Sequence, residues 1–332
     1  MKFIKKEFKK SNVKKFLSMA MIASLSITLL SACGSKKGEV KNIGISQLVE
    51  HPALDLSKEG FLEGLKEEGF EEGKNIKIDM QNAQGDVPTA QTIANKFVTD
   101  NKDLIFAIAT PSVQAAKNAT NEIPIIFTAV SDPANAKIVK SNENPGGNIS
   151  GTSDFQNINK SLDAMNEVLP DAKKIGAIFN TSEINSKIQI ENIKEAAKKR
   201  NMEVIDMGVS STNEISQAVS ALAKKTDLIF TPTDNLMAAS MPLIVETAKK
   251  DKVPVIGSEE AHVQNGALAA NSLSYKEIGR EAGKMAARVL NGEDISKMPV
   301  VFTDKARVVV NEKTMNELSI QLKNTDKVEF IK

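Results

Sequence analysis

Apolar and polar positions along the chain predict strands and helices in regular succession. A continuous apolar run over residues 104–109 is typical of a strand whose two faces are both covered. The stretch that follows Asp86 has its apolar residues three and four positions apart, which predicts an amphipathic helix. Strand, helix, strand, helix repeats along most of the chain, and this order indicates a parallel α/β sheet.

Polar residues at the expected helix ends sharpen these boundaries. We expect Ser57 to cap a helix that ends at Gly69, and the chain end to form a helix over residues 311–322. Two further helices begin with the spacing of a capping box, at Ser211-Thr-Asn-Glu214 and at Ser274-Tyr-Lys-Glu277.

A strand, a polar loop and a helix occur twice. Asp103-Leu-Ile-Phe106 is followed by a Thr-Pro-Ser loop, and Asp227-Leu-Ile-Phe230 is followed by Thr-Pro-Thr. Matching segments elsewhere keep similar offsets, which indicates an internal duplication into two similar lobes. Chance similarity between two parallel α/β halves is the alternative. The predicted fold is α/β, with two Rossmann-like lobes that each contain a parallel sheet.

The Gly-rich segment at residues 145–151 breaks this pattern and suggests a hinge. We expect lobe 1 to contain residues 41–151 with 273–302, and lobe 2 to contain residues 152–272 with 303–332. The chain would then cross between the lobes three times, near positions 150, 272 and 303. Three crossings would allow the two lobes to close on each other.

Polar residues follow the predicted strands where ligands bind in open α/β sheets, beyond the carboxyl ends of the strands. Hydroxyl groups and backbone N–H groups at helix N-termini, here around Ser112 and Ser131, suit a carboxylate. Asp234, in the second lobe, suits an ammonium group. The two together predict a clamp for an amino acid, and the alternative is that these side chains only cap helices.

The sequence offers little catalytic chemistry. It has two histidines, without metal-ligand spacing, and no nucleophile elbow or phosphate-binding loop. His51 either fixes its loop or contacts a ligand, and Glu259 with Glu260 could act as an acid–base pair or accept a cation. We expect no enzyme activity, no metal and no cofactor. After residue 32 the chain carries a net charge of about −5, which disfavours nucleic acid as a partner.

The N-terminus has the pattern of a targeting segment. Seven lysines precede or flank an apolar stretch over residues 16–30, which is too short to cross a bilayer comfortably. Leu30-Ser-Ala-Cys33 resembles the bacterial lipobox, and Cys33 is the only cysteine in the sequence. We therefore expect a signal peptide over residues 1–32, lipidation of Cys33 and a tether over residues 33–40. An uncleaved signal anchor is the alternative.

The chain resembles the substrate-binding lipoproteins of ABC importers, in particular the family with tryptophan- and tyrosine-binding components. The resemblance is carried by Ile45-Ser-Gln47, Glu50-His-Pro-Ala-Leu-Asp55, Gly60-Phe61, Thr110-Pro-Ser112, Phe127-Thr-Ala-Val-Ser-Asp-Pro133 and Thr231-Pro-Thr-Asp-Asn235. It implies a type I periplasmic binding fold, a lipid-anchored monomer on the outside of the bacterial cell membrane, and permease and ATPase partners. The implied ligand is an amino acid, often aromatic. The implied ligand-binding residues are Gln47, Thr110, Ser112, Ser131, Asn180, Ser182, Thr233, Asp234 and Glu259.

The kind of ligand stays open at this point. The sequence has no Trp and one Tyr, Tyr275, so aromatic stacking would come from Phe155 or Phe179. A sugar or nucleoside binder, and a surface adhesion or interaction lipoprotein, are the alternative functions.

Overall fold

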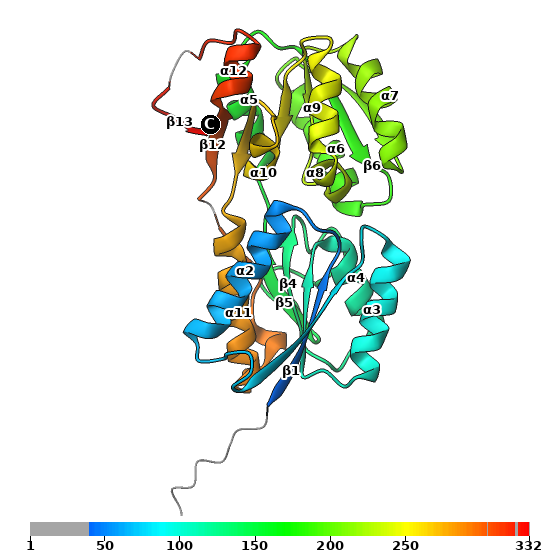
Figure 1. Ribbon diagram of the computed structural model, residues 1–332, viewed down its shortest axis with the longest axis vertical. Helices are drawn as coiled ribbons and strands as arrows, with labels where there is room; N and C mark the ends of the chain where they lie inside the picture. Colours follow the sequence, from blue (N-terminus) through cyan, green and yellow to red (C-terminus); the bar gives the residue numbers. More distant parts are fainter. Residues whose placement is uncertain (1–39, 304, 323–324, 332) are drawn as a thin grey trace, which may run out of the picture. The chain divides into compact units, whose positions relative to one another are not determined.

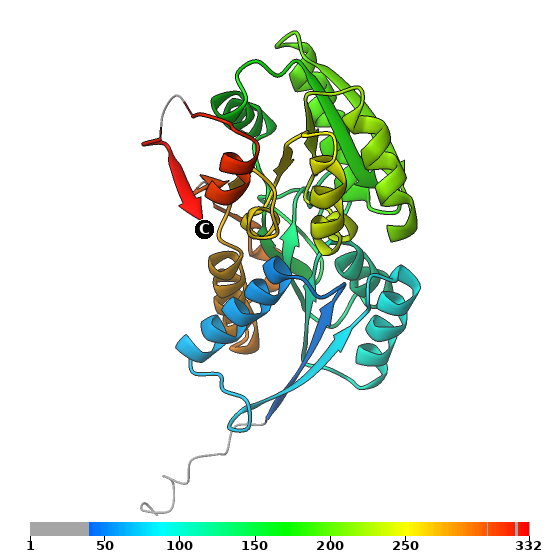
Figure 2. The same ribbon diagram turned by 45° about the horizontal axis from the view of Figure 1, so that its top comes forward.

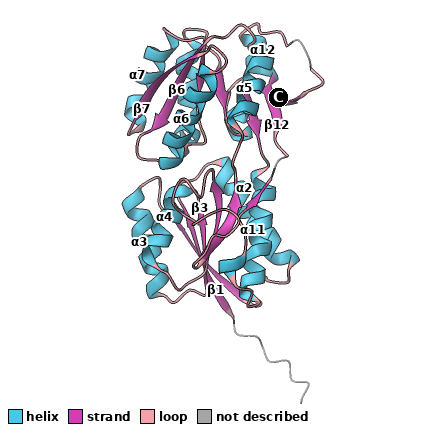
Figure 3. Ribbon diagram, turned by 180° about the vertical axis from the view of Figure 1, so that it is seen from behind, coloured by secondary structure: helices cyan, strands magenta, loops and turns pink. Residues whose placement is uncertain are grey.

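The computed structural model describes residues 40–303, 305–322 and 325–331, and their strands form two separate sheets (Figure 1). The first sheet has six strands in the order β11-β5-β4-β3-β1-β2, and every pairing within it is parallel. Helices cover both faces (Figure 3). The strands are β1 (Lys41–Gln47), β2 (Ile76–Asn82), β3 (Leu104–Ile108), β4 (Ile125–Val130), β5 (Ile149–Ser153) and β11 (Val301–Phe302). The accompanying helices are α2 (Pro52–Glu67), α3 (Val87–Thr99), α4 (Thr110–Ala119), α11 (Tyr275–Leu290) and the 3-10 turn η1 (Ile295–Lys297).

The second sheet has seven strands in the order β13-β12-β10-β9-β8-β6-β7. Its pairings are parallel except that between β10 and β12. The strands are β6 (Lys174–Asn180), β7 (Glu203–Val209), β8 (Leu228–Phe230), β9 (Val255–Gly257), β10 (Ala269–Ser272), β12 (Arg307–Asn311) and β13 (Val328–Ile331). The helices are α5 (Ile158–Val168), α6 (Ile184–Lys198), α7 (Thr212–Ala223), α8 (Asn235–Ala239), α9 (Met241–Lys249), α10 (Glu260–Gln264) and α12 (Glu312–Glu317).

These two mostly parallel sheets confirm the predicted α/β fold. We use lobe 1 for the elements around the six-stranded sheet and lobe 2 for those around the seven-stranded sheet. The chain passes from one sheet to the other after β5, after β10 and after β11. This sorting supports the predicted lobe boundaries, which remain a proposal.

The central strands are buried because both of their faces are covered by helices. All five residues of β3 are buried, and the ring of Phe106 stacks on that of Phe61 from α2, with 3.6 Å between the ring centroids. In lobe 2 the three residues of β8 are likewise buried. Burial of such apolar side chains is the main source of stability in each lobe.

Helices α2 and α11 lie against each other with their backbones in close approach. A Cβ atom added to Gly60 would lie 2.0 Å from the carbonyl oxygen of Lys276, and one added to Gly283 would lie 2.2 Å from that of Phe61. Only glycine permits this distance. The approach holds the start of α11, with Tyr275, beside α2.

Two of the expected helix boundaries are wrong. Helix α2 begins at Pro52, a residue whose fixed φ suits the first turn, and Ser57 lies inside it, buried, with its hydroxyl donating to the Tyr275 carbonyl oxygen. The predicted helix over residues 311–322 is limited to α12. Strand β13, which the sequence pattern did not predict, lies at the edge of the seven-stranded sheet (Figure 2).

Candidate functional site

The loops that follow several strands line two small adjoining cavities. We call the cavity beside His51 the inner cavity and the one beside Phe155 the outer cavity. The inner cavity is lined by His51, Leu54, Ala129, Ser131, Asp154, Asn185, Thr233, Asp234, Asn235, Glu259 and Tyr275. The outer cavity is lined by Ser131, Asp132, Phe155, Gln156, Ile158, Ser161, Asn185, Ile188, Gln189, Asn192, Phe230, Thr233 and Ser258.

Three buried acidic groups line the inner cavity, and a fourth, Glu183, hydrogen-bonds to the lining residues Asn185 and Asn235. Asp154, Glu183, Asp234 and Glu259 are each at most 2% exposed. Among the described residues, no lysine or arginine lines either cavity. Burial also lowers the pKa of His51 to about 4, so this imidazole is neutral at pH 7 and supplies no positive charge. The site is therefore acidic, and the lining residues that the structure describes supply no positive charge to it.

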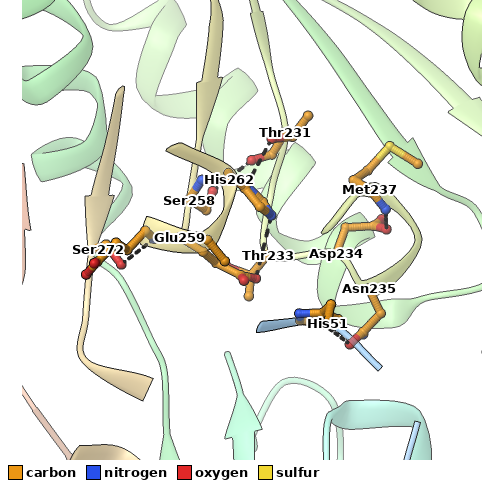
Figure 4. A network of polar contacts seen from close by, with 12 residues as sticks. His51, Thr231, Thr233, Asp234, Asn235, Met237, Ser258, Glu259, His262 and Ser272 are labelled. Carbon is orange, nitrogen blue, oxygen red and sulfur yellow. Dashed lines mark hydrogen bonds and ion pairs between the residues drawn. The ribbon is translucent and has the colours of Figure 1, made fainter. Parts of the chain in front are cut away.

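Two of these carboxyl groups are fully occupied by the protein. Asp234 accepts hydrogen bonds from the Met237 N–H at 2.9 Å, the Asn180 N–H at 2.6 Å and the Ser186 hydroxyl at 2.7 Å. Figure 4 shows the Asp234–Met237 bond, which caps α8. Glu183 accepts from the Asn235 backbone and side chain and from the Asn185 amide. Burial raises the pKa of both groups, and these hydrogen bonds oppose the rise.

The other two, Asp154 and Glu259, keep unused acceptor atoms, and we call them the anchor carboxylates. Asp154 Oδ2 accepts from the Tyr275 hydroxyl at 2.7 Å, whereas its Oδ1 is buried without a hydrogen-bond partner among the described residues. Glu259 Oε2 is also buried without a hydrogen-bond partner among the described residues. Glu259 Oε1 lies 3.9 Å from Nε2 of His262. The pKa of His262 is lowered by burial to about 3, so it is neutral.

Burial raises the pKa of both anchor carboxylates, and the charge of Asp154 raises that of Glu259 further. A buried carboxylate without a full set of partners is costly. A cation bound in the inner cavity would relieve this cost. The arrangement therefore suits a positively charged, hydrogen-donating group.

Lobe 1, whose strand β5 leads to Asp154 in the inner cavity, also offers hydroxyl groups and a helix N-terminus. Ala109, which follows β3, and Ala129, which lies within β4, have φ of 77° and 55°, a left-handed conformation that costs energy for a residue with a Cβ atom. Ala109 precedes α4, a ten-residue helix without a side-chain cap, and Ser112 in its first turn has a buried hydroxyl without a described partner. Ser131 follows β4 and lines both cavities. Hydroxyl groups and a free helix N-terminus suit an anion.

The two lobes also meet through a polar contact. His51 Nε2 lies 3.4 Å from the side-chain oxygen of Asn235, the first residue of α8 (Figure 4). His51 is 5% exposed, so the contact lies inside the protein. It joins the start of α2 to the start of α8, at the boundary of the inner cavity.

The outer cavity combines apolar walls with amide side chains. Phe155 and Phe230 line it together with Ile158 and Ile188. Phe155 was predicted as a stacking residue, and it lies here. Phe179 packs against the lobe 2 core and lines neither cavity.

The structure brings four of the nine predicted ligand residues to the inner cavity: Ser131, Thr233, Asp234 and Glu259. The other five line neither cavity, and no ligand tests their roles. Gln47, Thr110 and Ser112 are buried in lobe 1, Asn180 lines a separate groove, and Ser182 is exposed.

Sequence reasoning missed Asp154, Asn185, Gln189 and the role of Tyr275. Asp154 directly follows β5, so the strand-end rule could have found it. The other three lie on helices, where the sequence pattern gave no signal.

Outside the cavities the described residues show little further chemistry. They contain no cluster of His, Cys, Asp and Glu that could hold a metal ion. Among the same residues, no helix has both the length and the apolar character needed to cross a membrane. Cys33, the predicted signal peptide and nearly all of the tether lie outside the described part of the chain.

Known proteins resemble this chain over most of its length. The family model described as "ABC transporter substrate binding protein" matches residues 42–329. A protein of Clostridioides difficile (strain R20291) named "Tyrosine-binding protein" is 48% identical over 332 residues, which cover 96% of both chains.

Two solved structures are similar as well. An ABC domain from Streptococcus pneumoniae in complex with L-Trp has a TM-score of 0.86 at 35% identity, covering 88% of this chain and 100% of the other. The ligand-free, open structure of a substrate binding protein with adhesive properties from Clostridium difficile has a TM-score of 0.69 at 48% identity, covering 88% and 99%. The more similar sequence thus gives the lower structural similarity, as expected if the lobes are more closed here than in that open structure.

Proposed function

This protein belongs to the ABC transporter substrate-binding proteins, and we propose that it captures an aromatic amino acid between its two lobes and delivers it to a membrane permease. Its fold is that of the type I periplasmic binding proteins. The family is one of solute-binding proteins, and its members act outside the cytoplasm. The candidate ligands are tyrosine, tryptophan and phenylalanine.

The observation that carries this proposal is the pair of anchor carboxylates, Asp154 and Glu259. Each has a buried oxygen without a partner among the described residues, and no lysine or arginine lines either cavity. The α-ammonium group of an amino acid would supply the missing positive charge and three donors. A neutral sugar could donate hydrogen bonds to these oxygens but would supply no positive charge, which disfavours the alternative of a sugar binder.

We place the ligand carboxylate on the lobe 1 side, at Ser131 and the N-terminus of α4 with Thr110 and Ser112. The sequence alone favoured Asp234 as the ammonium acceptor. Because both oxygens of Asp234 already accept hydrogen bonds from the protein, we instead propose that Asp234 holds the cavity wall. Thr233 lies beside the ligand in this arrangement.

The aromatic character is supported by the relatives and by the outer cavity. One relative is named for tyrosine binding, and the pneumococcal structure contains L-Trp. Phe155 and Phe230 offer aromatic walls for the ligand side chain.

Calorimetric titration with the twenty amino acids tests the proposal. We expect tight binding of one or more of the three aromatic amino acids and weak or no heat with the rest. Mass spectrometry of small molecules released on denaturation provides an independent identification. A flat response to all twenty, with no retained amino acid, would refute the proposal.

We further propose that the protein is a monomer tethered through an acyl chain on Cys33. Labelled palmitate should enter the wild-type protein in bacterial cells, and Cys33→Ser should abolish both the label and the membrane association. Retention of the variant in the membrane fraction would instead favour an uncleaved signal anchor.

Surface adhesion is a second candidate function, favoured by the adhesive properties of the C. difficile relative. Binding of the purified protein to cultured epithelial cells would measure it. A level equal to that of an unrelated lipoprotein would exclude it.

A further inference from the structure

Gln189, on α6, presents a free hydrogen-bond donor at the outer cavity. Its side-chain oxygen accepts from the Thr233 backbone N–H at 3.0 Å. A backbone N–H can only donate, so this bond fixes which end of the amide faces Thr233. The other end, Nε2, is buried and has no partner among the residues that the structure describes.

Asn185, one helical turn earlier, presents the complementary acceptor. Its Nδ2 donates to the Thr233 carbonyl oxygen at 2.9 Å and to Glu183 at 3.1 Å. Both partners can only accept at these atoms, so the orientation of this amide is fixed as well. Oδ1 is left buried and lacks a partner in the described part of the chain. The backbone of Thr233 therefore holds both amides in place, and both line the outer cavity.

We propose that Gln189 and Asn185 form a subsite for the side-chain hydroxyl of the ligand and select tyrosine over phenylalanine and tryptophan. A phenol hydroxyl donates one hydrogen bond and accepts another, so it satisfies both free atoms. An indole N–H only donates, and a phenyl ring does neither. A ligand that leaves a buried donor or acceptor unpaired is penalised. This inference rests on the proposed function, because it assumes an aromatic amino acid in the cavity.

The position of Gln189 assigns it to the ligand side chain. Gln189 lines the outer cavity only, with the apolar side chains of Phe155, Ile188 and Phe230, whereas the anchor carboxylates line the inner cavity only. An ammonium group held at the inner cavity leaves the outer one for the aromatic ring. The hydroxyl at the far end of the ring then comes to α6.

Affinity measurements on two variants test the subsite. Gln189→Met keeps the size of the side chain and removes the donor, and it should lower the ratio of tyrosine to phenylalanine affinity by about 10-fold or more. Gln189→Glu keeps an acceptor for the Thr233 N–H, so the loop stays in place, and replaces the free donor with an acceptor. This change should shift the preference from tyrosine toward tryptophan, because the phenol hydroxyl loses the donor that it accepts from, whereas an indole N–H needs only an acceptor. Gln217→Met, the same substitution at an exposed position of α7, should change neither ratio.

Calorimetry with tyrosine, phenylalanine and tryptophan separates the two ways of being wrong. If the wild type binds none of the three, the proposed function fails and the subsite fails with it. If the wild type binds aromatic amino acids but Gln189→Met keeps the tyrosine-to-phenylalanine ratio within about 2-fold of wild type, the function stands and the subsite is overturned. A wild type that binds phenylalanine as tightly as tyrosine also overturns it.

Discussion

Two isosteric substitutions, Asp154→Asn and Asp234→Asn, distinguish a carboxylate that binds ligand from one that holds the fold. Asp154→Asn leaves an oxygen that can accept from the Tyr275 hydroxyl, and places an NH2 group where the unpartnered Oδ1 stands. A donor then faces the ligand ammonium instead of an acceptor. Asp234→Asn replaces one of two oxygens that already accept hydrogen bonds from the protein.

The two substitutions should change different quantities: Asp154→Asn the affinity for ligand, and Asp234→Asn the stability of the protein. A hydrogen bond to a charged group contributes about 1.5–3 kcal/mol, so Asp154→Asn should weaken ligand binding by roughly 10- to 150-fold. The ligand-free protein should be as stable as wild type or more so, because the substitution removes a buried charge that also raises the pKa of Glu259.

Asp234→Asn should act on stability. Loss of a helix cap costs about 1 kcal/mol, and the NH2 group loses at least one further bond to an N–H or O–H donor. Each kcal/mol lowers Tm by about 2–4 °C in a protein of this size class. We expect the affinity of the folded variant to stay within about 3-fold of wild type, a difference of under about 1 kcal/mol.

Calorimetric titration with the best-binding aromatic amino acid, combined with thermal unfolding without ligand, measures both quantities for both variants. The opposite pattern, in which Asp234→Asn weakens binding by about 10-fold or more while Asp154→Asn leaves it unchanged, would refute the reasoning. It would show that Asp234 holds the ammonium group, as the sequence alone suggested.

Three further predictions follow from charge and packing. The pKa of the anchor carboxylates is raised without ligand, and a bound ammonium group would keep them ionised. Ligand binding should therefore release protons, and the affinity should fall as the pH falls. Equal binding heats in buffers of different ionisation enthalpy would contradict this. The pKa of His262 falls from 6.5 to about 3 on folding, so the stability that depends on its neutral form is present above pH 6.5 and is lost toward pH 3, at up to about 1.4 kcal/mol per pH unit. His262→Gln should flatten the plot of urea midpoint against pH in this range. An unchanged plot would argue against a neutral buried imidazole. Gly283→Ala should lower Tm by about 5 °C or more, because the added Cβ would lie 2.2 Å from the Phe61 carbonyl oxygen. Glu281→Ala, on the same helix, should change Tm little. Equal effects of the two substitutions would exclude the close approach of the helices as the cause.

Much of the fold could be predicted because its signals are local. Buried parallel strands are apolar throughout, and polar loops follow them, as in β3 and the loop that begins at Thr110. The boundaries that failed depend on other parts of the chain or on weak patterns. Ser57 has the chemistry of a cap, but Pro52 starts the helix five residues earlier. Helix α5 lies in a segment that we did not assign, although its apolar positions include the buried Leu162.

The site could be predicted only in part, because the decisive differences are not local. Asp154 and Asp234 each follow a strand and have the same chemistry. What separates them is the number of donors that reach each carboxylate. For Asp234, the Asn180 N–H and the Ser186 hydroxyl come from 54 and 48 positions away. For Asp154, a hydroxyl donor comes from Tyr275, 121 positions away. Such partners are known only once the chain is folded.

The charge distribution also gives a reason why closure would depend on ligand. The loop after β5 and the loop after β9 bring the anchor carboxylates to one cavity that no described lysine or arginine lines, so closure on an empty site must either bury negative charge or protonate these groups. The His51–Asn235 contact across the lobes is a polar interaction at 3.4 Å, long for a hydrogen bond, and contributes little against that cost. A ligand can shift a conformational equilibrium only as far as its affinities for the two states differ. In the proposed arrangement, an ammonium group contacts both anchor carboxylates only when the lobes are closed. The ligand would therefore bind the closed state more tightly than the open one, and the closed state is the one that is less stable without ligand.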